Sequence, residues 1–108
     1  MDIMTVLKAL ADDTRMNILS LLLKKNYCVR ALSQNLKISE AAISQHLKVL
    51  REAGLITGEK QSYFVHYSVN KEILHELAKE IENLTLIKRE ISTDNNNTEK
   101  SHCCHKTI

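Results

Sequence analysis

Two short helical segments joined by a tight turn are the feature that most constrains the fold of this chain. The spacing of apolar residues predicts one helix from about Val29 to Leu36 and a second from Ser39 to Gly54, with Lys37 and Ile38 between them. The hydroxyl of Ser39 can cap the second helix, and glycine is favoured just past a helix end. Two helices on so tight a turn are typical of a helix-turn-helix.

The periodicity changes after Gly54. Leu55 to Glu59 and Tyr63 to Val69 are rich in β-branched and aromatic residues, and Lys60-Gln61-Ser62 joins them. These runs predict a β-hairpin. A helix-turn-helix followed directly by a hairpin is the layout of a winged helix-turn-helix, which places its second helix in a DNA groove.

Further helices are predicted on both sides of this unit. The first runs from Asp2 to Leu10, and a second, capped by Asp12 or Asp13, ends near Lys24 and Lys25. Asn70 can cap a long last helix whose apolar residues alternate in steps of three and four, as in a helix that packs against a partner. We therefore expect a mainly α fold with a small β-hairpin wing, in the order α-α-α-α-β-β-α. The apolar residues of the last helix are Leu74, Leu77, Ile81 and Leu84.

The apolar pattern divides the chain into two parts. Residues 1–91 can form one modest core, since the 108 residues are 44% hydrophobic. Residues 92–108 open with a polar run, so we expect a flexible tail that carries cysteine and histidine. No run approaches the ~18 apolar residues of a membrane helix, and no signal-peptide pattern is visible. The expected location is the cytoplasm, with no membrane partner.

Charge and motifs exclude few functions but argue against an enzyme. The net charge of +2 only weakly favours a nucleic-acid partner, because a solvated mixed surface carries a similar charge. The chain lacks paired carboxylates, a Ser/His/Asp set and a Gly-rich phosphate loop, so catalysis is not expected. The three cysteines are an odd number with two adjacent, which argues against a disulfide framework.

The second helix of the helix-turn-helix is the expected DNA-reading element. Its apolar residues Ile43, Leu47 and Leu50 share one face, which leaves small and polar groups outside. Gln45 can pair with adenine, while Lys48 can neutralise a phosphate. An ordinary amphipathic surface helix has a similar pattern, but the tight turn, the cap and the hairpin together favour DNA. The expected contacts on this helix are Ser39, Glu40, Ala41, Ser44, Gln45, His46 and Lys48.

Residues 7–19 (LKALADDTRMNIL) and 38–56 (ISEAAISQHLKVLREAGLI), with His66-Tyr67, resemble the ArsR family of bacterial metalloregulatory repressors over about residues 5–85. The resemblance implies a homodimer through the first and last helices, a recognition helix from Ser39 to Ala53, wings that touch flanking DNA, and an inducer that lowers operator affinity. On this basis the dimer residues are Ile3, Leu7, Leu74, Leu77, Ile81 and Leu84.

The chain departs from the family pattern in the turn and the wing. Lys37 and Ser62 stand where the family often has glycine, so a left-handed backbone at Lys37 would cost about 1–2 kcal/mol. Glu59 replaces a basic residue of the wing. Lys60 is therefore the wing residue that we expect to contact DNA.

The family's sensor sites are incomplete here. Family members with a thiolate site carry Cys-Val-Cys-Asp where this chain has Cys28-Val29-Arg30-Ala31, so only the first ligand is kept. Other family members have a metal site on the last helix. The positions that correspond to its ligands hold Lys71 and Ile73 here, which argues against a zinc sensor of that design.

The remaining candidate metal ligands include the thiolates of the three cysteines, which are soft ligands. Thiolates suit arsenite, antimonite, cadmium, lead or copper(I). The alternatives are a structural Cys28 and an idle tail. The candidate ligands are Cys28, His102, Cys103, Cys104 and His105.

Three functions follow from these residues. We expect a repressor that releases operator DNA when it binds a soft metal or metalloid ion. The first alternative is a repressor of the same fold that uses its cysteines as a thiol redox sensor. The second alternative is a metal-binding interaction module that does not act on DNA.

Overall fold

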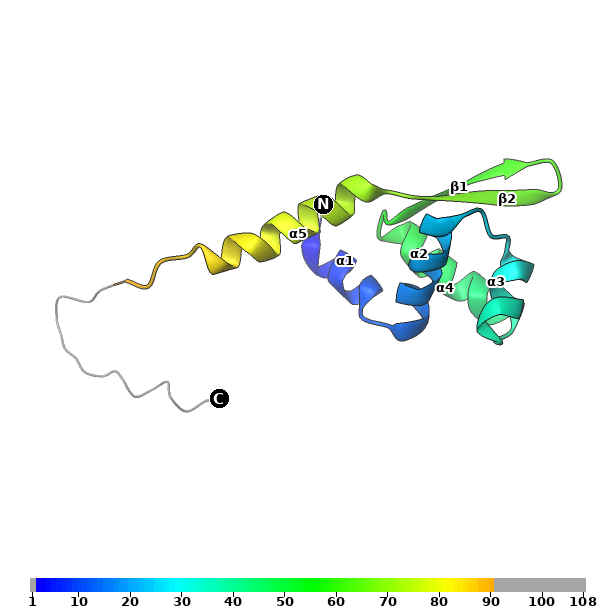
Figure 1. Cartoon of the computed structure of the whole chain (residues 1–108), viewed down its shortest axis with the longest axis horizontal. Coiled ribbons are helices and arrows are strands. Elements are labelled where there is room, and N and C mark those ends of the chain that lie inside the picture. The colour runs from blue at the N-terminus through cyan, green and yellow to red at the C-terminus, as the bar shows by residue number, and fades with distance from the viewer. Residues whose placement is uncertain (1, 91–108) are drawn as a thin grey trace.

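The computed structural model describes residues 2–90. This part of the chain contains five helices and one antiparallel hairpin in the predicted order, so the winged helix-turn-helix fold is confirmed. Figure 1 shows the first four helices packed together, with the hairpin extending from one side and the last helix from the other. The elements are α1 (Ile3–Leu10), α2 (Asp13–Lys24), α3 (Val29–Leu36), α4 (Glu40–Glu52), β1 (Ile56–Gln61), β2 (Phe64–Val69) and α5 (Lys71–Thr85).

Polar side chains cap four of the helices. Asp2, Asp12, Ser39 and Asn70 precede α1, α2, α4 and α5, and each side chain accepts a hydrogen bond from a backbone N–H of the first turn. These bonds satisfy donors that have no partner within the helix. Two predicted helix starts move by one residue, since Asp2 and Ser39 are extended caps outside the helices.

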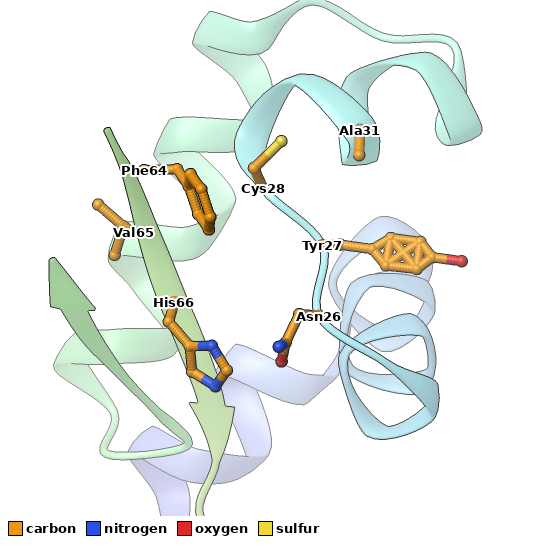
Figure 2. Close-up of a pocket in the computed structure, with 7 residues that line it drawn as sticks. All are labelled: Asn26, Tyr27, Cys28, Ala31, Phe64, Val65 and His66. Carbon is orange, nitrogen blue, oxygen red and sulfur yellow. The ribbon is translucent and has the colours of Figure 1, made fainter. Parts of the chain in front are cut away.

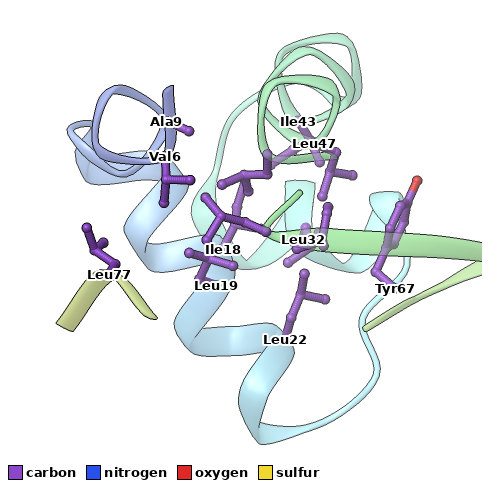
Figure 3. Close-up of a cluster of buried hydrophobic side chains, with 13 residues drawn as sticks. Val6, Ala9, Ile18, Leu19, Leu22, Leu32, Ile43, Leu47, Tyr67 and Leu77 are labelled. Atoms are coloured by element: carbon purple, nitrogen blue, oxygen red, sulfur yellow. The ribbon is translucent and has the colours of Figure 1, made fainter. Parts of the chain in front are cut away.

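The core is formed by the inner faces of four helices and the start of the wing. Figure 3 shows Ile18 and Leu19 of α2 between α1 and α4, with Leu32 of α3 nearby. The α4 residues Ile43, Leu47 and Leu50 are at most 1% exposed, as their predicted face requires. The whole core consists of Val6, Ala9, Ile18, Leu19, Leu22, Leu32, Ile43, Leu47, Leu50, Leu55, Ile56, Tyr67 and Leu77.

Gly54 ends the recognition helix as the sequence predicts. Its φ of +82° lies in the left-handed region, and a Cβ atom here would lie 2.9 Å from Cδ1 of Ile73. The carbonyl of Gly54 accepts a hydrogen bond of 3.3 Å from the side chain of Asn70. The cap of α5 is therefore also tied to the end of α4.

The hairpin turn lies one to two residues later than predicted. Lys60-Gln61-Ser62 was the expected loop, but Lys60 and Gln61 belong to β1, and Gln61 pairs with Phe64. The turn is therefore Ser62-Tyr63. Ser62 has φ +58°, as required at the first central position of a tight hairpin turn. The prediction was wrong here because no Asn-Gly or Asp-Gly pair marks the turn.

The last helix extends away from the rest of the described chain (Figure 1). Leu77 is 6% exposed and lies next to Val6 of α1 (Figure 3). Beyond Leu77, Ile81 and Leu84 are 47% and 66% exposed. No helix in residues 2–90 is long and apolar enough to cross a membrane.

Candidate nucleic-acid interface

The turn between α3 and α4 fixes the angle at which the recognition helix leaves the core. Lys37 has φ +60° and ψ +42°, the left-handed conformation anticipated for it. The backbone N–H groups of Lys37 and Ile38 both donate to the carbonyl of Ser33, at 2.8 and 3.3 Å. The Ser33 hydroxyl in turn donates to the carbonyl of Ile38. Three hydrogen bonds thus hold a backbone conformation that a non-glycine residue disfavours.

The outer face of α4 is exposed to solvent. Gln45 and Lys48 are exposed, while Ile43 and Leu47 on the opposite face are buried. A rigid helix with a polar outer face is what a DNA groove requires. Individual DNA contacts remain predictions. The exposed predicted residues are Ser39, Glu40, Ala41, Ser44, Gln45 and Lys48.

The predicted contact His46 lies differently from its neighbours. Its imidazole faces α2 and is 24% exposed. Nη1 of Arg15 lies 3.3 Å from Nδ1 of His46, and a carboxylate oxygen of Asp12 lies 3.9 Å from the same nitrogen. The expected contact of His46 with the DNA backbone stays a prediction. Sequence reasoning did not identify Arg15, whose partner is 31 positions away.

Asp12 is held beside this pair by the cap of α2. Its carboxylate accepts a hydrogen bond of 3.0 Å from the backbone N–H of Arg15. That hydrogen bond, with the positive charge of Arg15 and the nearby imidazole of His46, lowers the pKa of the Asp12 carboxyl. A negative group is therefore fixed close to the recognition helix.

The wing carries one predicted contact and one residue that sequence reasoning missed. Lys60 is exposed in β1, opposite Val65, while Glu59 lies opposite His66. Tyr63 at the tip is 99% exposed, the most exposed large hydrophobic side chain of the described residues. The only sign of Tyr63 in the sequence was the presence of an aromatic residue in the predicted hairpin.

Cys28 lies between the start of α3 and the wing. It precedes α3, its side chain forms no capping hydrogen bond, and it is a half-buried free thiol. Figure 2 shows Cys28 and Phe64 on opposite sides of a hollow between β2 and the segment before α3, with the Cys28 sulfur pointing away from the Phe64 ring. This hollow has a volume of about 210 Å³, and His66 and Tyr27 also line it. A second hollow of about 320 Å³ is lined by Cys28 and Phe64 as well.

The predicted metal-ligand set stays a prediction, because most of its members lie outside the described residues. Within residues 2–90 no group of three or more Cys, His, Asp or Glu side chains could hold a metal ion. Cys28 is the only one of the predicted ligands that is described. The others, which are His102, Cys103, Cys104 and His105, lie outside the described residues.

The predicted dimer residues divide into three groups by their exposure in the single chain. Leu77 belongs to the core of one chain, which differs from the expectation that it lies on the dimer seam. Ile81 and Leu84 are exposed, and the remaining three, Ile3, Leu7 and Leu74, are half-buried.

Comparisons with known proteins define the class of this fold and site. The family model described as "Bacterial regulatory protein, arsR family" matches residues 12–57, which include α2, α3 and α4. The transcriptional activator HlyU of Vibrio cholerae is 38% identical over 79 residues, which cover 67% of this chain and 73% of that protein. The arsenical resistance operon repressor of Staphylococcus aureus is 30% identical over 107 residues, which cover 99% of this chain and 91% of that protein.

A solved structure supports the same assignment. An ArsR-like transcriptional regulator from a Rhodococcus species superposes with a TM-score of 0.71 at 28% identity, covering 78% of this chain and 79% of that one. The chain belongs to the ArsR family of bacterial transcription regulators. It is accordingly a DNA-binding regulator of transcription rather than an enzyme.

Proposed function

We propose that this regulator represses transcription by binding operator DNA as a homodimer, and that a soft metal or metalloid ion such as arsenite releases it. The observation that carries the proposal is the free polar face of α4, opposite a face that is buried in the core. Gln45 reads a base on this face, and Lys48 neutralises a phosphate. The N-terminal end of α4, with its cap Ser39 and the first residues Glu40 and Ala41, approaches base edges because recognition helices read DNA with their N-terminal residues.

Repression is the favoured direction of regulation. The relatives include both an activator, HlyU, and a repressor of an arsenical resistance operon. The alignment to the repressor spans nearly the whole chain, whereas the alignment to the activator spans two thirds of it. The longer match supports repression and an arsenical inducer.

The end of α5 supports a homodimer. Ile81 and Leu84 of α5, with Leu86 and Ile87 just past its end, are all about half exposed or more where the helix leaves the body of the chain. Exposed apolar residues gathered at one place mark an interaction surface. A two-fold dimer would present two α4 helices to half-sites about 34 Å apart on one face of the duplex.

The position of Cys28 supports a sensor that acts on the DNA-binding elements. The Cys28 thiol, with the thiols of Cys103 and Cys104, would form a soft ligand set. Cys28 borders both α3 and β2, so an ion held there would act on the helix-turn-helix and the wing together. Release requires that the ion bind the DNA-free arrangement more tightly than the DNA-bound one.

The test uses fluorescence anisotropy of the full chain on an operator selected in vitro from random duplexes, titrated with sodium arsenite. Deletion of residues 101–108 should leave operator affinity within a few fold and abolish release. Cys28→Ser should impair release equally, and the combined variant should be no worse than either one, as expected for ligands of one site. Cys103→Ser with Cys104→Ser is the matched control that retains the length of the tail.

Three results would contradict the proposal in different ways. Unimpaired release of the tail-deleted protein would exclude the three-thiolate sensor. Release by hydrogen peroxide and not by arsenite would favour the thiol redox sensor. Failure to select any operator would favour the interaction module that does not act on DNA.

A further inference from the structure

Tyr63 at the tip of the wing is the aromatic side chain of residues 2–90 that packs least against its own chain. It is 99% exposed, and the side chain of Phe64 beside it is 54% exposed. The turn nevertheless holds Tyr63 in a defined place, because Gln61 pairs with Phe64 across it and Ser62 has φ +58°. A tyrosine with an apolar ring and a polar tip is suited to a contact outside its own chain.

The length and direction of the wing bring this tip towards the expected DNA. Figure 1 shows the hairpin extending towards the same end of the molecule as α3, which leads into the start of α4. β1 has six residues and so spans about 20 Å. Neighbouring grooves of a duplex are half a helical turn, or about 17 Å, apart. With α4 in a major groove, the tip can therefore reach the adjacent minor groove.

The charge of the wing does not account for a contact at the tip. Residues 56–69 contain one basic and one acidic residue, Lys60 and Glu59, which are adjacent in sequence and both exposed. Their opposite charges offset each other, so the wing gains little from the phosphate attraction that dominates nonspecific binding. A contact at the tip is therefore left to the ring and the hydroxyl of Tyr63.

The floor of a minor groove differs between base pairs in a way that a tyrosine can distinguish. An A·T pair presents only acceptors there, adenine N3 and thymine O2, whereas a G·C pair adds the N2 amino group of guanine. The Tyr63 hydroxyl can donate to either acceptor. The amino group of a G·C pair projects from the floor into the space that the ring would fill, so the ring is kept out.

We infer that Tyr63 inserts into the minor groove beside the site read by α4 and selects A·T base pairs there. This contact adds sequence information outside the major groove. Because Tyr63 carries no charge, its contribution is insensitive to salt, unlike a phosphate contact of Lys60. The inference rests on the proposed operator binding and is independent of the proposed sensor.

The experiment first locates the contact. Hydroxyl-radical footprints of the full chain and of Tyr63→Ala on the selected operator should differ at one minor-groove position in each half-site. The base pair at that position is then changed from A·T to G·C and to inosine·cytosine, which has the major groove of G·C without the N2 amino group. For the unmodified chain, G·C should lower affinity by about fivefold per half-site, the size of one hydrogen bond. Inosine·cytosine should bind as well as A·T.

Three variants separate the ring from the charge of the wing. Tyr63→Ala should bind all three duplexes alike. Tyr63→Phe keeps the ring, so it should keep the preference for inosine·cytosine over G·C, with affinity lowered by no more than about threefold. Lys60→Ala is the matched control on the same wing: it should lower the salt slope by about one unit and retain the preference.

Two results would overturn the inference. An unchanged footprint and preference in Tyr63→Ala would show that the tip does not contact the minor groove. If inosine·cytosine binds as weakly as G·C, this position is read from the major groove instead. Because Tyr63 is exposed, its variants should unfold at the same urea concentration as the unmodified chain. If the unmodified chain binds no duplex selectively, the proposed operator binding itself fails.

Discussion

Cys28 and Phe64 border the same two hollows, although they belong to opposite ends of the DNA-binding unit. Phe64 begins the wing strand β2, and Cys28 immediately precedes α3. A ligand on the thiol would therefore lie between the wing and the start of α3.

Phe64 should transmit release to the wing. We expect Phe64→Ala to keep operator affinity within a few fold but to require at least tenfold more arsenite for release, because the hollow would accommodate the ion without moving β2. Phe64→Leu, which keeps most of the side-chain volume, is the control. Anisotropy titrations measure release, and equal arsenite dependence in Phe64→Ala and the unmodified chain would contradict this route.

Gln45 and Lys48 should affect DNA binding differently. We expect Gln45→Ala to cost about 1–3 kcal/mol at the selected operator and little at a scrambled one, because a base contact carries sequence information. Lys48→Ala should weaken both duplexes alike and lower the salt slope by about one unit. Salt titrations on both duplexes measure the two effects. Equal losses on the two duplexes for Gln45→Ala would exclude base reading by this residue.

The exposed end of α5 should hold the dimer. We expect Ile81→Lys combined with Leu84→Lys to give folded monomers with little operator affinity, because both side chains are exposed in the single chain. Leu77→Lys should instead destabilise folding by several kcal/mol, because it buries a charge in the core. Sedimentation separates the two outcomes. A stable dimer of the double variant would place the interface elsewhere.

Asp12 should contribute to stability at neutral pH and lose that contribution in acid. The folded-state pKa of its carboxyl is lowered, first by the hydrogen bond from the backbone N–H of Arg15, so the folded state favours the charged form. The contribution is present above the unfolded pKa of about 3.9 and is lost as the pH falls through the folded value. Asp12→Asn keeps a capping side chain but does not titrate. Urea unfolding between about pH 5 and pH 2 should show a smaller loss of stability for Asp12→Asn than for the unmodified chain.

Lys37 should be a site where glycine is stabilising. Lys37 adopts a left-handed backbone, and Lys37→Gly removes a steric cost of about 1–2 kcal/mol against a smaller loss of chain entropy. We expect a net gain of about 0.5–1 kcal/mol in the free energy of unfolding. Asn35→Gly, within α3, is the control and should lose a similar amount. A destabilised Lys37→Gly would show that the lysine side chain itself supports the turn.

Local residue patterns predicted the helices but not the contacts between them. Asp12, Ser39 and Asn70 were identifiable because a cap needs only its own helix. The hairpin turn at Ser62-Tyr63 was misplaced because no Asn-Gly or Asp-Gly pair marks it.

The candidate site shows the same division between local patterns, which are predictable, and contacts between distant residues, which are not. The exposed face of α4 follows from periodicity alone, whereas the orientation of His46 depends on Arg15, which is distant in sequence. The ligand set that would include Cys28 depends on residues beyond the described range.

The placement of α5 has a consequence for how the protein behaves at different abundances. Only the first half of this helix packs on its own chain, through Ile73, Leu74 and Leu77, so a proposed partner would have to cover Ile81 and Leu84. Folding of the helix end and association of two chains would then be one equilibrium. At low copy number, mass action would favour separated chains. Their helix ends would be frayed, and their affinity for the operator would be lower. Synthesis of the regulator would thereby set a threshold concentration for its own activity, independently of any inducer.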